Sequence, residues 1–415
     1  MTTPERTTGR TPPTTLRVAC ALALAAAVSL GLARFSYAML LPPMRADLGW
    51  SYLTAGTMNT VNAAGYLIGA LLAPWWMRRF GARAVLLAGG AAAALLLVGH
   101  GLVTADTPLH ALRLLTGVAS AATFVAGGLL AARLVGPHTP VAGRAAPSAG
   151  LVLGIYYGGV GVGIVASALL VPPLSGLAQA HAWQWAWVAL GACGAAAIAV
   201  TARATRHLAE AHGVTPAPAP APASASHGWQ QFSFGLASYF LFGLGYIGYM
   251  TFVVTLLREQ HLASGTITVF YALLGMAVMA SSWLWAGLLQ RHRGGGAMGR
   301  LDVLLAVATA LPVLSSHPGA VFASGLLFGS VFLSVVASTT ALVRHNLPPA
   351  AWPAGISAFT IMFAAGQIVG PSLVGWVADG AGGLRTGLAV SAGVLVFSAL
   401  LAWRQKPLVP STPPA

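Results

Sequence analysis

The residues of this sequence with the clearest chemical potential are two arginines, Arg34 and Arg113, which lie inside long apolar segments. A charge at membrane depth costs about 2.5–3.5 kcal/mol on insertion scales, so such residues usually serve a function. A guanidinium presents a planar fork of donors that matches a carboxylate or a phosphate. The pair therefore predicts a binding site for an organic anion. The alternatives are that each arginine extends to the membrane interface or pairs with Asp47, Asp106 or Glu259.

Polar side chains of other apolar segments are candidates to complete such a site. Asn59 and Asn62 lie three residues apart, on one face of an expected helix, and Tyr66 continues that face. Groups of this kind usually form hydrogen bonds between helices with modest gain, so a structural role stays open for each. The candidate substrate-binding residues are Arg34, Tyr37, Asn59, Asn62, Arg113, Tyr156, Tyr246, Tyr249 and Gln367.

Acidic residues are scarce, and their positions restrict the chemistry. All seven Asp and Glu residues, Asp302 among them, fall in tails, in loops or at the ends of apolar segments. An exporter of cationic compounds usually needs a buried acid, so this pattern disfavours a cationic substrate. Coupling to protons would need another titratable group, and His100 near the end of its segment is the candidate.

The composition is that of a membrane protein. Of 415 residues, 57% are hydrophobic and 7% are charged, whereas a soluble domain has about a quarter charged residues. The net charge of +14 falls mainly in short loops, which predicts contact with a lipid bilayer and argues against nucleic acid as a partner. The sequence has no metal-ligand spacing, no phosphate-binding loop and no nucleophile–base pair. We expect no metal, no cofactor and no enzymatic activity.

Twelve apolar segments of about 20 residues predict an all-α membrane protein with twelve transmembrane helices. They form two six-helix bundles, at 16–203 and 231–403, with a Pro/Ala-rich linker at 204–230 and tails at 1–15 and 404–415. The first segment has a basic flank, as a signal peptide does, but it is too long for one. Arg and Lys residues concentrate in alternate loops, so the positive-inside rule places both termini in the cytoplasm.

A weak internal repeat relates the two bundles. The stretch Gly31-Leu-Ala-Arg-Phe-Ser-Tyr37 returns in altered form at Gly243-Leu-Gly-Tyr-Ile-Gly-Tyr249, with Tyr246 in the place of Arg34. Internal repeats on this scale predict a transporter whose substrate site lies between the halves, near the middle of the membrane.

These features together resemble a transporter of the major facilitator superfamily. The stretch Trp76-Met-Arg-Arg-Phe-Gly-Ala-Arg83 is similar to the superfamily signature Gly-x-x-x-Asp-Arg-x-Gly-Arg-Arg, although Arg78 stands in the place of the Asp. The stretch Arg113-Leu-Leu-Thr-Gly117 is similar to an Arg-x-x-x-Gly element linked to coupling. The resemblance implies a pseudo-symmetric fold in which spans one, four, seven and ten line the centre. The residues expected to gate or couple transport are Arg79, Gly81, Arg83 and Arg113 of these stretches, together with His100.

Within the superfamily, the sequence resembles the bacterial YbfB/YjiJ-like branch, through Gly31–Tyr37, Asn62–Gly69, Gly243–Ile247 with Thr251-Phe252, and Phe363–Pro371. The branch does not specify a substrate. We expect a monomeric secondary transporter of the bacterial inner membrane that works by alternating access. Its expected cargo is a small organic anion, with a proton or an exchanged anion as the coupled species. The alternatives are an exporter of neutral or amphipathic compounds and a non-transporting membrane sensor on the same scaffold.

Overall fold

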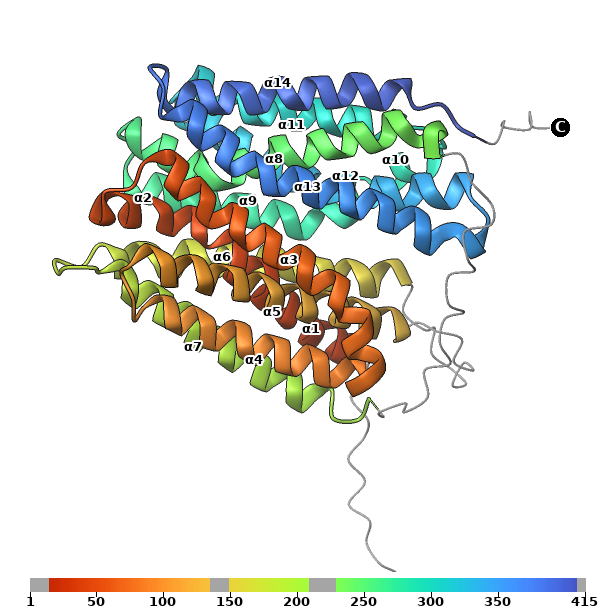
Figure 1. Cartoon of the computed structure of the whole chain (residues 1–415), viewed down its shortest axis with the longest axis horizontal. Helices are drawn as coiled ribbons and strands as arrows, with labels where there is room; N and C mark the ends of the chain where they lie inside the picture. Colours follow the sequence, from red (N-terminus) through yellow and green to blue (C-terminus); the bar gives the residue numbers. More distant parts are fainter. Residues whose placement is uncertain (1–14, 135–148, 209–228, 409–415) are drawn as a thin grey trace, which may run out of the picture.

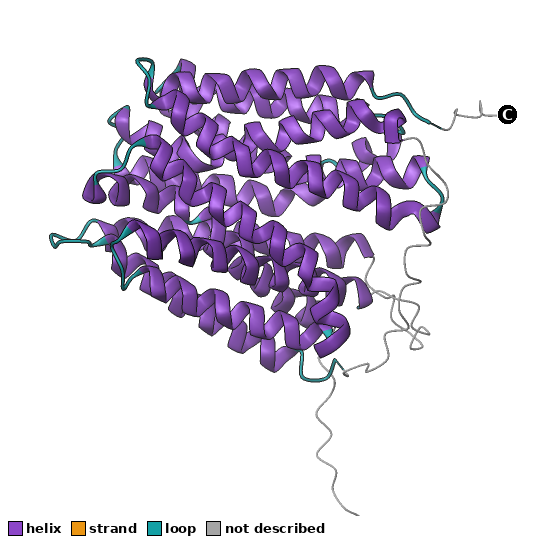
Figure 2. Cartoon of the chain, viewed as in Figure 1, coloured by secondary structure: helices purple, strands orange, loops and turns teal. Residues whose placement is uncertain are grey.

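The protein is seen here in a computed structural model that describes residues 15–134, 149–208 and 229–408. Every regular element of these residues is a helix (Figure 2). Most of the predicted linker and most of the predicted tails lie outside the described residues, so their bounds stay predictions. The predicted all-α class is confirmed.

The first six spans occur in the predicted order along the chain. Span one is a composite of α1 (Thr15–Ala26), the π-helix η1 (Ala27–Phe35) and α2 (Tyr37–Leu48). The next five spans are α3 (Tyr52–Phe80), α4 (Ala82–His100), α5 (Asp106–Arg133), α6 (Ala149–Ser175) and α7 (Trp183–Ala204).

The second six spans repeat this plan. After the short η2 (Trp229–Phe232) come α8 (Ser233–Glu259), α9 (Ser264–Leu284) with α10 (Ala286–Arg291), α11 (Gly296–Leu314), α12 (Pro318–Asn346), η3 (Pro349–Ala351), α13 (Trp352–Ala378) and α14 (Gly383–Arg404). Eleven of the described helical runs are long and apolar enough to cross a membrane. The more polar α3 has 29 residues and packs between α5 and α13, so we count it as the twelfth span.

The spans form two groups that lie side by side in Figure 1, with α4, α5 and α7 in one group and α8, α11 and α14 in the other. The chain enters span one and leaves α14 at the same end of the bundle, which we call the terminal end. The opposite end, where α2 is followed by α3 and α13 by α14, is called the far end. Two layers of spans thus meet along one interface that runs between these ends.

Gly31 and Gly243 occupy corresponding positions of the internal repeat, and both lie where two helices pack closely. A Cβ atom on Gly31 of η1 would lie 2.5 Å from Cα of Gly163 in α6. A Cβ atom on Gly243 of α8 would lie 2.5 Å from the carbonyl oxygen of Phe363 in α13. Span one therefore packs on span five as span seven packs on span eleven, and the repeat predicted from the sequence is present in the fold.

A nine-residue π-helix holds Arg34 in span one. The backbone N–H of Ser36 donates to the carbonyl of Gly31 at 3.0 Å, five residues earlier, which is the π-helical spacing. Stretches of π-helix often occur at functional sites, because they change the direction of the side chains they carry. Nothing in the amino-acid pattern of span one predicted this π-helix.

Candidate functional site

Arg34 is a buried cation without hydrogen-bond partners for two of its nitrogens. Its side chain is 2% exposed, and its Nε and Nη2 atoms have no partner among the described residues. Its guanidinium carbon lies 5.4 Å from the centre of the Tyr66 ring on α3. Among the described residues no carboxylate pairs with Arg34, so its charge is left available for a ligand.

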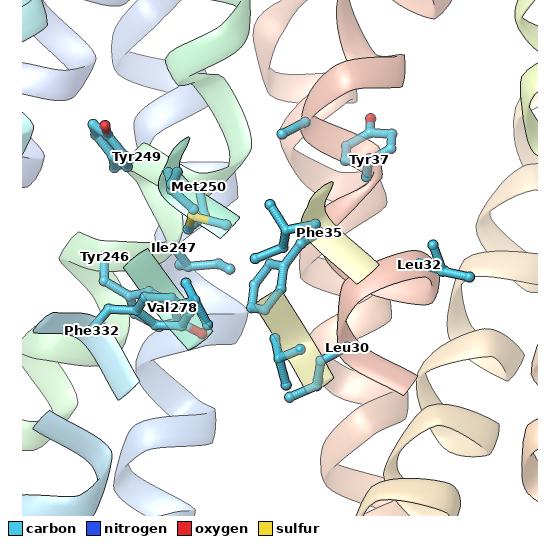
Figure 3. Close-up of a cluster of buried hydrophobic side chains, with 14 of the residues drawn as sticks. Leu30, Leu32, Phe35, Tyr37, Tyr246, Ile247, Tyr249, Met250, Val278 and Phe332 are labelled. Carbon is cyan, nitrogen blue, oxygen red and sulfur yellow. The ribbon is translucent and has the colours of Figure 1, made fainter. Parts of the chain in front are cut away.

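The residues next to Arg34 come from both halves. The Tyr246 hydroxyl of α8 lies close enough to interact electrostatically with Arg34, and it accepts a hydrogen bond from Nε2 of Gln367 on α13. Phe35 projects from span one toward Tyr246 and Phe332, and its ring centre lies 5.8 Å from that of Phe332 (Figure 3). Arg34 therefore lies at the interface between the halves, together with the predicted residues Tyr246 and Gln367.

Arg113 on α5 is equally buried, at 1% exposed, but all three of its guanidinium nitrogens have partners. Nε donates to the carbonyl of Met58 at 3.3 Å and Nη1 to the carbonyl of Ala33 at 3.1 Å. Nη2 donates to Oδ1 of Asn59 at 3.0 Å, and the guanidinium carbon lies 4.7 Å from the centre of the Tyr37 ring. Its charge is thus solvated by the protein, and neither alternative considered for it from sequence, the interface or an acid partner, is seen in the described residues.

Asn59 connects Arg113 to the other half. Besides accepting from Arg113, Asn59 donates from Nδ2 to Oγ1 of Thr251 on α8 at 2.7 Å. Asn62, one turn further along α3, donates to the carbonyl of Arg113 at 3.0 Å, while its buried Oδ1 has no partner in the part of the chain that the structure describes. The chain Arg113–Asn59–Thr251 runs across three spans and both halves, and Thr251 was not among the predicted residues.

Three of the predicted tyrosines bond to their own half. Tyr37 and Tyr156 donate to backbone carbonyls, of Ala55 at 2.8 Å and of Phe124 at 2.6 Å. The Tyr249 hydroxyl lies 2.7 Å from Oγ of Ser324, on the side of α8 that turns away from Phe35 (Figure 3). The structure therefore does not bring Tyr156 or Tyr249 to Arg34, and it puts Tyr37 beside Arg113.

His100, the candidate for proton coupling, packs in the interior of the N-terminal half. It is 0% exposed and its ring stacks on Trp187, with centres 4.5 Å apart. Nδ1 lies 2.7 Å from the carbonyl oxygen of Leu96, and Nε2 is buried without a partner. Arg113 packs against the same Trp187 ring, with its guanidinium carbon 6.0 Å from the ring centre.

The loop after span two stays with the N-terminal half. Gly81 joins α3 to α4 with a φ of 82°, a conformation that favours glycine. Arg83 donates from Nε to the carbonyl of Thr205 and from Nη2 to that of Ala202, both at 3.1 Å. These are carbonyls at the C-terminal end of α7, where a cation is favoured. Arg79 lies over the Phe80 ring at 5.6 Å, so none of the three residues reaches the other half through these contacts.

At the far end, acidic side chains join the two halves. Asp379, which follows α13, accepts hydrogen bonds from the backbone N–H groups of Tyr52 at 2.8 Å and Leu53 at 2.9 Å. The Tyr52 hydroxyl donates to Glu259 of α8, and Arg45 of α2 lies 3.9 Å from the same carboxylate. Sequence analysis treated these acids only as possible partners of the buried arginines or as loop residues.

The interface of α3 with α13 is tight at the far end and ends before the terminal end. Thr60 donates from Oγ1 to the carbonyl of Ile368 at 2.7 Å, and a Cβ atom on Gly56 would lie 2.3 Å from the carbonyl oxygen of Pro371. The same helix faces continue to Leu71 and Ile361, which are 60% and 46% exposed. The halves are therefore closed beyond Arg34 and part toward the terminal end.

Asp302 is a buried acid, which its place at the end of an apolar segment did not predict. It lies at the end of its span, as predicted, but it is 0% exposed, because α8 and α14 cover it. Its Oδ2 accepts a hydrogen bond from Ser398 at 2.7 Å, and its Oδ1 has no partner in the described residues. The neighbouring Ser238 precedes Tyr246 by eight residues, about 12 Å along the helix, so this acid does not neutralise Arg34.

Two apolar grooves lie away from Arg34. One of about 750 Å³ is lined by apolar residues of α3, α4 and α5, among them Trp76, Phe80, Leu95 and Leu115. A second, of about 490 Å³, lies between α4 and α7. Neither has a charged or strongly polar residue in its lining, so neither contains a group that would recognise an anion.

Known proteins share this architecture. A bacterial homolog of the human lysosomal transporter Spinster, solved in an inward-facing and unoccupied conformation, superimposes with a TM-score of 0.74 at 16% identity, over 96% of this chain and 98% of that chain. The nucleoside transporter NupG, as its D323A mutant, superimposes with a TM-score of 0.71 at 14% identity, over 94% of this chain and 99% of that chain. At these identities the likeness shows the fold alone, and no curated protein sequence matches the chain.

A family model assigns the sequence itself. The model described as the uncharacterised MFS-type transporter YbfB matches residues 26–403, which include all twelve spans except the first turns of span one and the last residue of α14. Together with the twelve-helix fold, this match means that the chain belongs to the YbfB-like family of major facilitator superfamily transporters, a family of multi-pass membrane proteins.

Proposed function

We propose that this transporter moves a small organic anion across the bacterial inner membrane by alternating access, and that Arg34 binds the anion. The observation that carries the proposal is the pair of unpartnered nitrogens on Arg34, a side chain that is 2% exposed. A buried charge without a partner costs several kcal/mol, so a ligand that brings the opposite charge recovers part of that cost. A carboxylate or phosphate matches the guanidinium fork. A bound anion of this kind would neutralise Arg34 without an acidic residue of the protein.

The contrast with Arg113 supports Arg34 as the ligand-binding cation. Both arginines are buried, but Arg113 already donates to Met58, Ala33 and Asn59. A substrate at Arg113 would first have to break these bonds. We therefore give Arg113 a role in holding α5 to span one and α3, and in transmitting movement through Asn59.

The two ends of the bundle fit opposite sides of the membrane. Under the positive-inside rule the terminal end is cytoplasmic and the far end faces outward. The far end is closed by Asp379 and Glu259, whereas α3 and α13 part toward the terminal end. In this proposal the protein releases or takes up substrate on the cytoplasmic side in this state, and breaking the far-end contacts opens the other side.

Thermal stabilisation of the purified full-length protein tests the proposal. A panel of organic anions, cations and neutral compounds is added to the native protein and to the Arg34→Gln and Arg34→Lys variants. A bound compound at 100 times its Kd raises stability by about 2.7 kcal/mol. We expect anions alone to stabilise the native protein, Arg34→Gln to lose the effect, and Arg34→Lys to keep part of it.

The control is Arg385→Gln, which neutralises an exposed arginine on α14 and should leave the stabilisation unchanged. Stabilisation by neutral or amphipathic compounds in both the native protein and Arg34→Gln would refute the anion site and favour an exporter of such compounds. Binding of an anion without any flux into proteoliposomes would instead favour a sensor.

A further inference from the structure

Five aromatic rings of the C-terminal half form a nearly parallel set beside Arg34, which we call the aromatic array. Its members are Tyr239, Phe242, Tyr246, Phe332 and Phe363. Neighbouring rings have centres 4.9–5.9 Å apart and planes within 10–18° of one another. They come from α8, α12 and α13, so three separate spans hold their rings in one orientation.

The array runs from Arg34 toward the terminal end. Tyr246 lies beside Arg34, and Tyr239 lies seven residues earlier on α8, about 10 Å nearer the terminal end. Phe363 is the partly exposed member, whereas the other four are buried. The array thus extends from the free guanidinium in the direction in which α3 and α13 part, and Phe363 is the ring that a ligand can reach in this state.

The charge at the site fits one anionic group. All three guanidinium nitrogens of Arg113 donate to the protein, and two nitrogens of Arg34 do not. Next to Arg34 the C-terminal half offers one side-chain amide, Gln367, and the hydroxyl of Tyr246. A dicarboxylate would bring a second charge, and the described residues show no second unpartnered guanidinium beside Arg34 to meet it. A sugar would need more hydrogen-bonding groups than Gln367, Tyr246 and Tyr66 provide there.

We propose that the substrate is an aromatic monocarboxylate, with its carboxylate on Arg34 and its ring against the aromatic array. This inference rests on the proposed anion transport and adds the chemical class of the anion. Aromatic rings gain about 0.5–1.5 kcal/mol from offset stacking or edge-to-face contact beyond the burial of their area, which gives a planar ring an advantage over a saturated ring of similar size.

Binding constants of four matched compounds test the class. Calorimetric titration of the purified full-length protein compares benzoate with cyclohexanecarboxylate, benzyl alcohol and phthalate. We expect benzoate to bind about 2–12-fold more tightly than cyclohexanecarboxylate. Benzyl alcohol lacks the carboxylate and phthalate carries a second one, so both should bind more weakly than benzoate.

Substitutions in the aromatic array test the contribution of its rings to binding independently of the charge on Arg34. Phe363→Leu should reduce the preference for benzoate over cyclohexanecarboxylate to about onefold to twofold, while Phe363→Tyr keeps a ring and should preserve it. Phe332→Leu tests the same surface if Phe363→Leu does not fold. The matched control is Phe270→Leu, since Phe270 is a fully buried phenylalanine of α9 outside the array, and it should leave the preference intact.

The outcomes distinguish this inference from the proposed function. If cyclohexanecarboxylate binds as tightly as benzoate and both depend on Arg34, the aromatic class is wrong and anion transport stands. If phthalate binds more tightly than benzoate, the single charge is wrong. If benzyl alcohol matches benzoate, and Arg34→Gln binds both as the native protein does, the proposed monocarboxylate class and the anion site are both wrong.

Discussion

Asp379 caps the first turn of α3 across the interface between the two halves, since its carboxylate accepts the backbone N–H of Tyr52 at 2.8 Å and of Leu53 at 2.9 Å. The N-terminus of a helix carries unpaired N–H groups and a partial positive charge, so an anion there is stabilising. The bond joins residues 327 positions apart in the chain and depends on the far end being closed. Asp379 is thus placed to favour the closed far end over an open one.

We expect Asp379→Asn to open the far end more often. Loss of a charged acceptor for two N–H groups should cost the closed state about 1–2 kcal/mol, which raises the open population by about 5–30-fold. The reporter is Ser372 of α13, whose Oγ lies 2.8 Å from Oγ1 of Thr60 on α3 in the closed interface. The measurement is labelling of Ser372→Cys by a membrane-impermeant maleimide, in a protein in which Cys20 and Cys193 are replaced by serine. Labelling should be faster in the Asp379→Asn background.

Asp106→Asn is the matched control for the effect of Asp379→Asn on labelling. Asp106 lies at the same end, but it accepts from Nε1 of Trp50 at 2.7 Å, within its own half. Its replacement should not change the rate of labelling. Equal rates in the Asp379→Asn and native backgrounds would mean that the cap does not hold the far end closed.

Arg34 and Arg113 should have opposite effects on the stability of the ligand-free protein. Arg113→Gln removes the donor to the carbonyls of Met58 and Ala33, so we expect the free energy of unfolding to fall by about 2–4 kcal/mol. Arg34→Gln replaces an unpartnered buried charge by a neutral amide, so stability should stay equal or rise by about 1–2 kcal/mol, while anion binding is lost.

Thermal unfolding in detergent measures both variants, and each is checked for membrane insertion first. A drop in stability for Arg34→Gln as large as that for Arg113→Gln would show that Arg34 is a structural residue. The charge-preserving Arg113→Lys serves as a control, because a lysine cannot reach three separate acceptors and should still be destabilised.

The fold was predictable because a bilayer leaves the backbone few choices. A segment of about 20 apolar residues must satisfy its own N–H and C=O groups, so the pattern of the sequence leads directly to twelve helices. The π-helix around Arg34 was not predictable in this way. It involves the close approach of Gly31 to Gly163, and nothing in the local sequence shows which glycine of span one meets which glycine of span five.

Only those residues of the candidate site could be predicted whose type is unusual in the surrounding sequence. An arginine in an apolar segment is conspicuous, so both Arg34 and Arg113 were found, but their difference depends on acceptors supplied by other spans. Thr251 stood out only within a stretch that resembles the family branch, and Asp379 only as one of seven acids. Neither was predicted as a contact between the halves, because their partners Asn59 and Tyr52 lie 192 and 327 positions away. Contacts between halves form only once all spans are packed.

Tyr246→Phe should weaken substrate binding more than it slows turnover. The hydroxyl accepts from Nε2 of Gln367 beside Arg34, so its loss frees a buried amide and removes a polar group that contacts the site. A lost hydrogen bond of about 0.5–1.5 kcal/mol corresponds to a rise in KM of about 2–12-fold. Tyr249→Phe is the control, because the Tyr249 hydroxyl bonds to Ser324 on the other side of α8. An unchanged KM in Tyr246→Phe would remove Tyr246 from the site.

The chain Arg113–Asn59–Thr251 should transmit movement between the halves. Thr251→Val removes the acceptor of the Asn59 Nδ2 group but leaves the bond from Arg113 to Asn59, so stability should fall by about 1 kcal/mol and turnover should change. Asn59→Ala removes both bonds and should cost more, about 2–3 kcal/mol. If the three residues act as one unit, the double variant should lose less than the sum of the single losses, a difference of about 0.5–3 kcal/mol.

Thr255→Val is the matched control for that experiment. Thr255 lies one turn beyond Thr251 on the same helix, 3% exposed, and its Oγ1 has no hydrogen-bond partner among the described residues. Its replacement by valine should therefore be neutral or slightly stabilising and should leave turnover unchanged, because an unsatisfied hydroxyl is exchanged for a methyl group. Additive losses in the Asn59→Ala/Thr251→Val protein, with turnover in Thr251→Val equal to that in Thr255→Val, would show that Asn59 and Thr251 only pack the interface and do not couple Arg113 to α8.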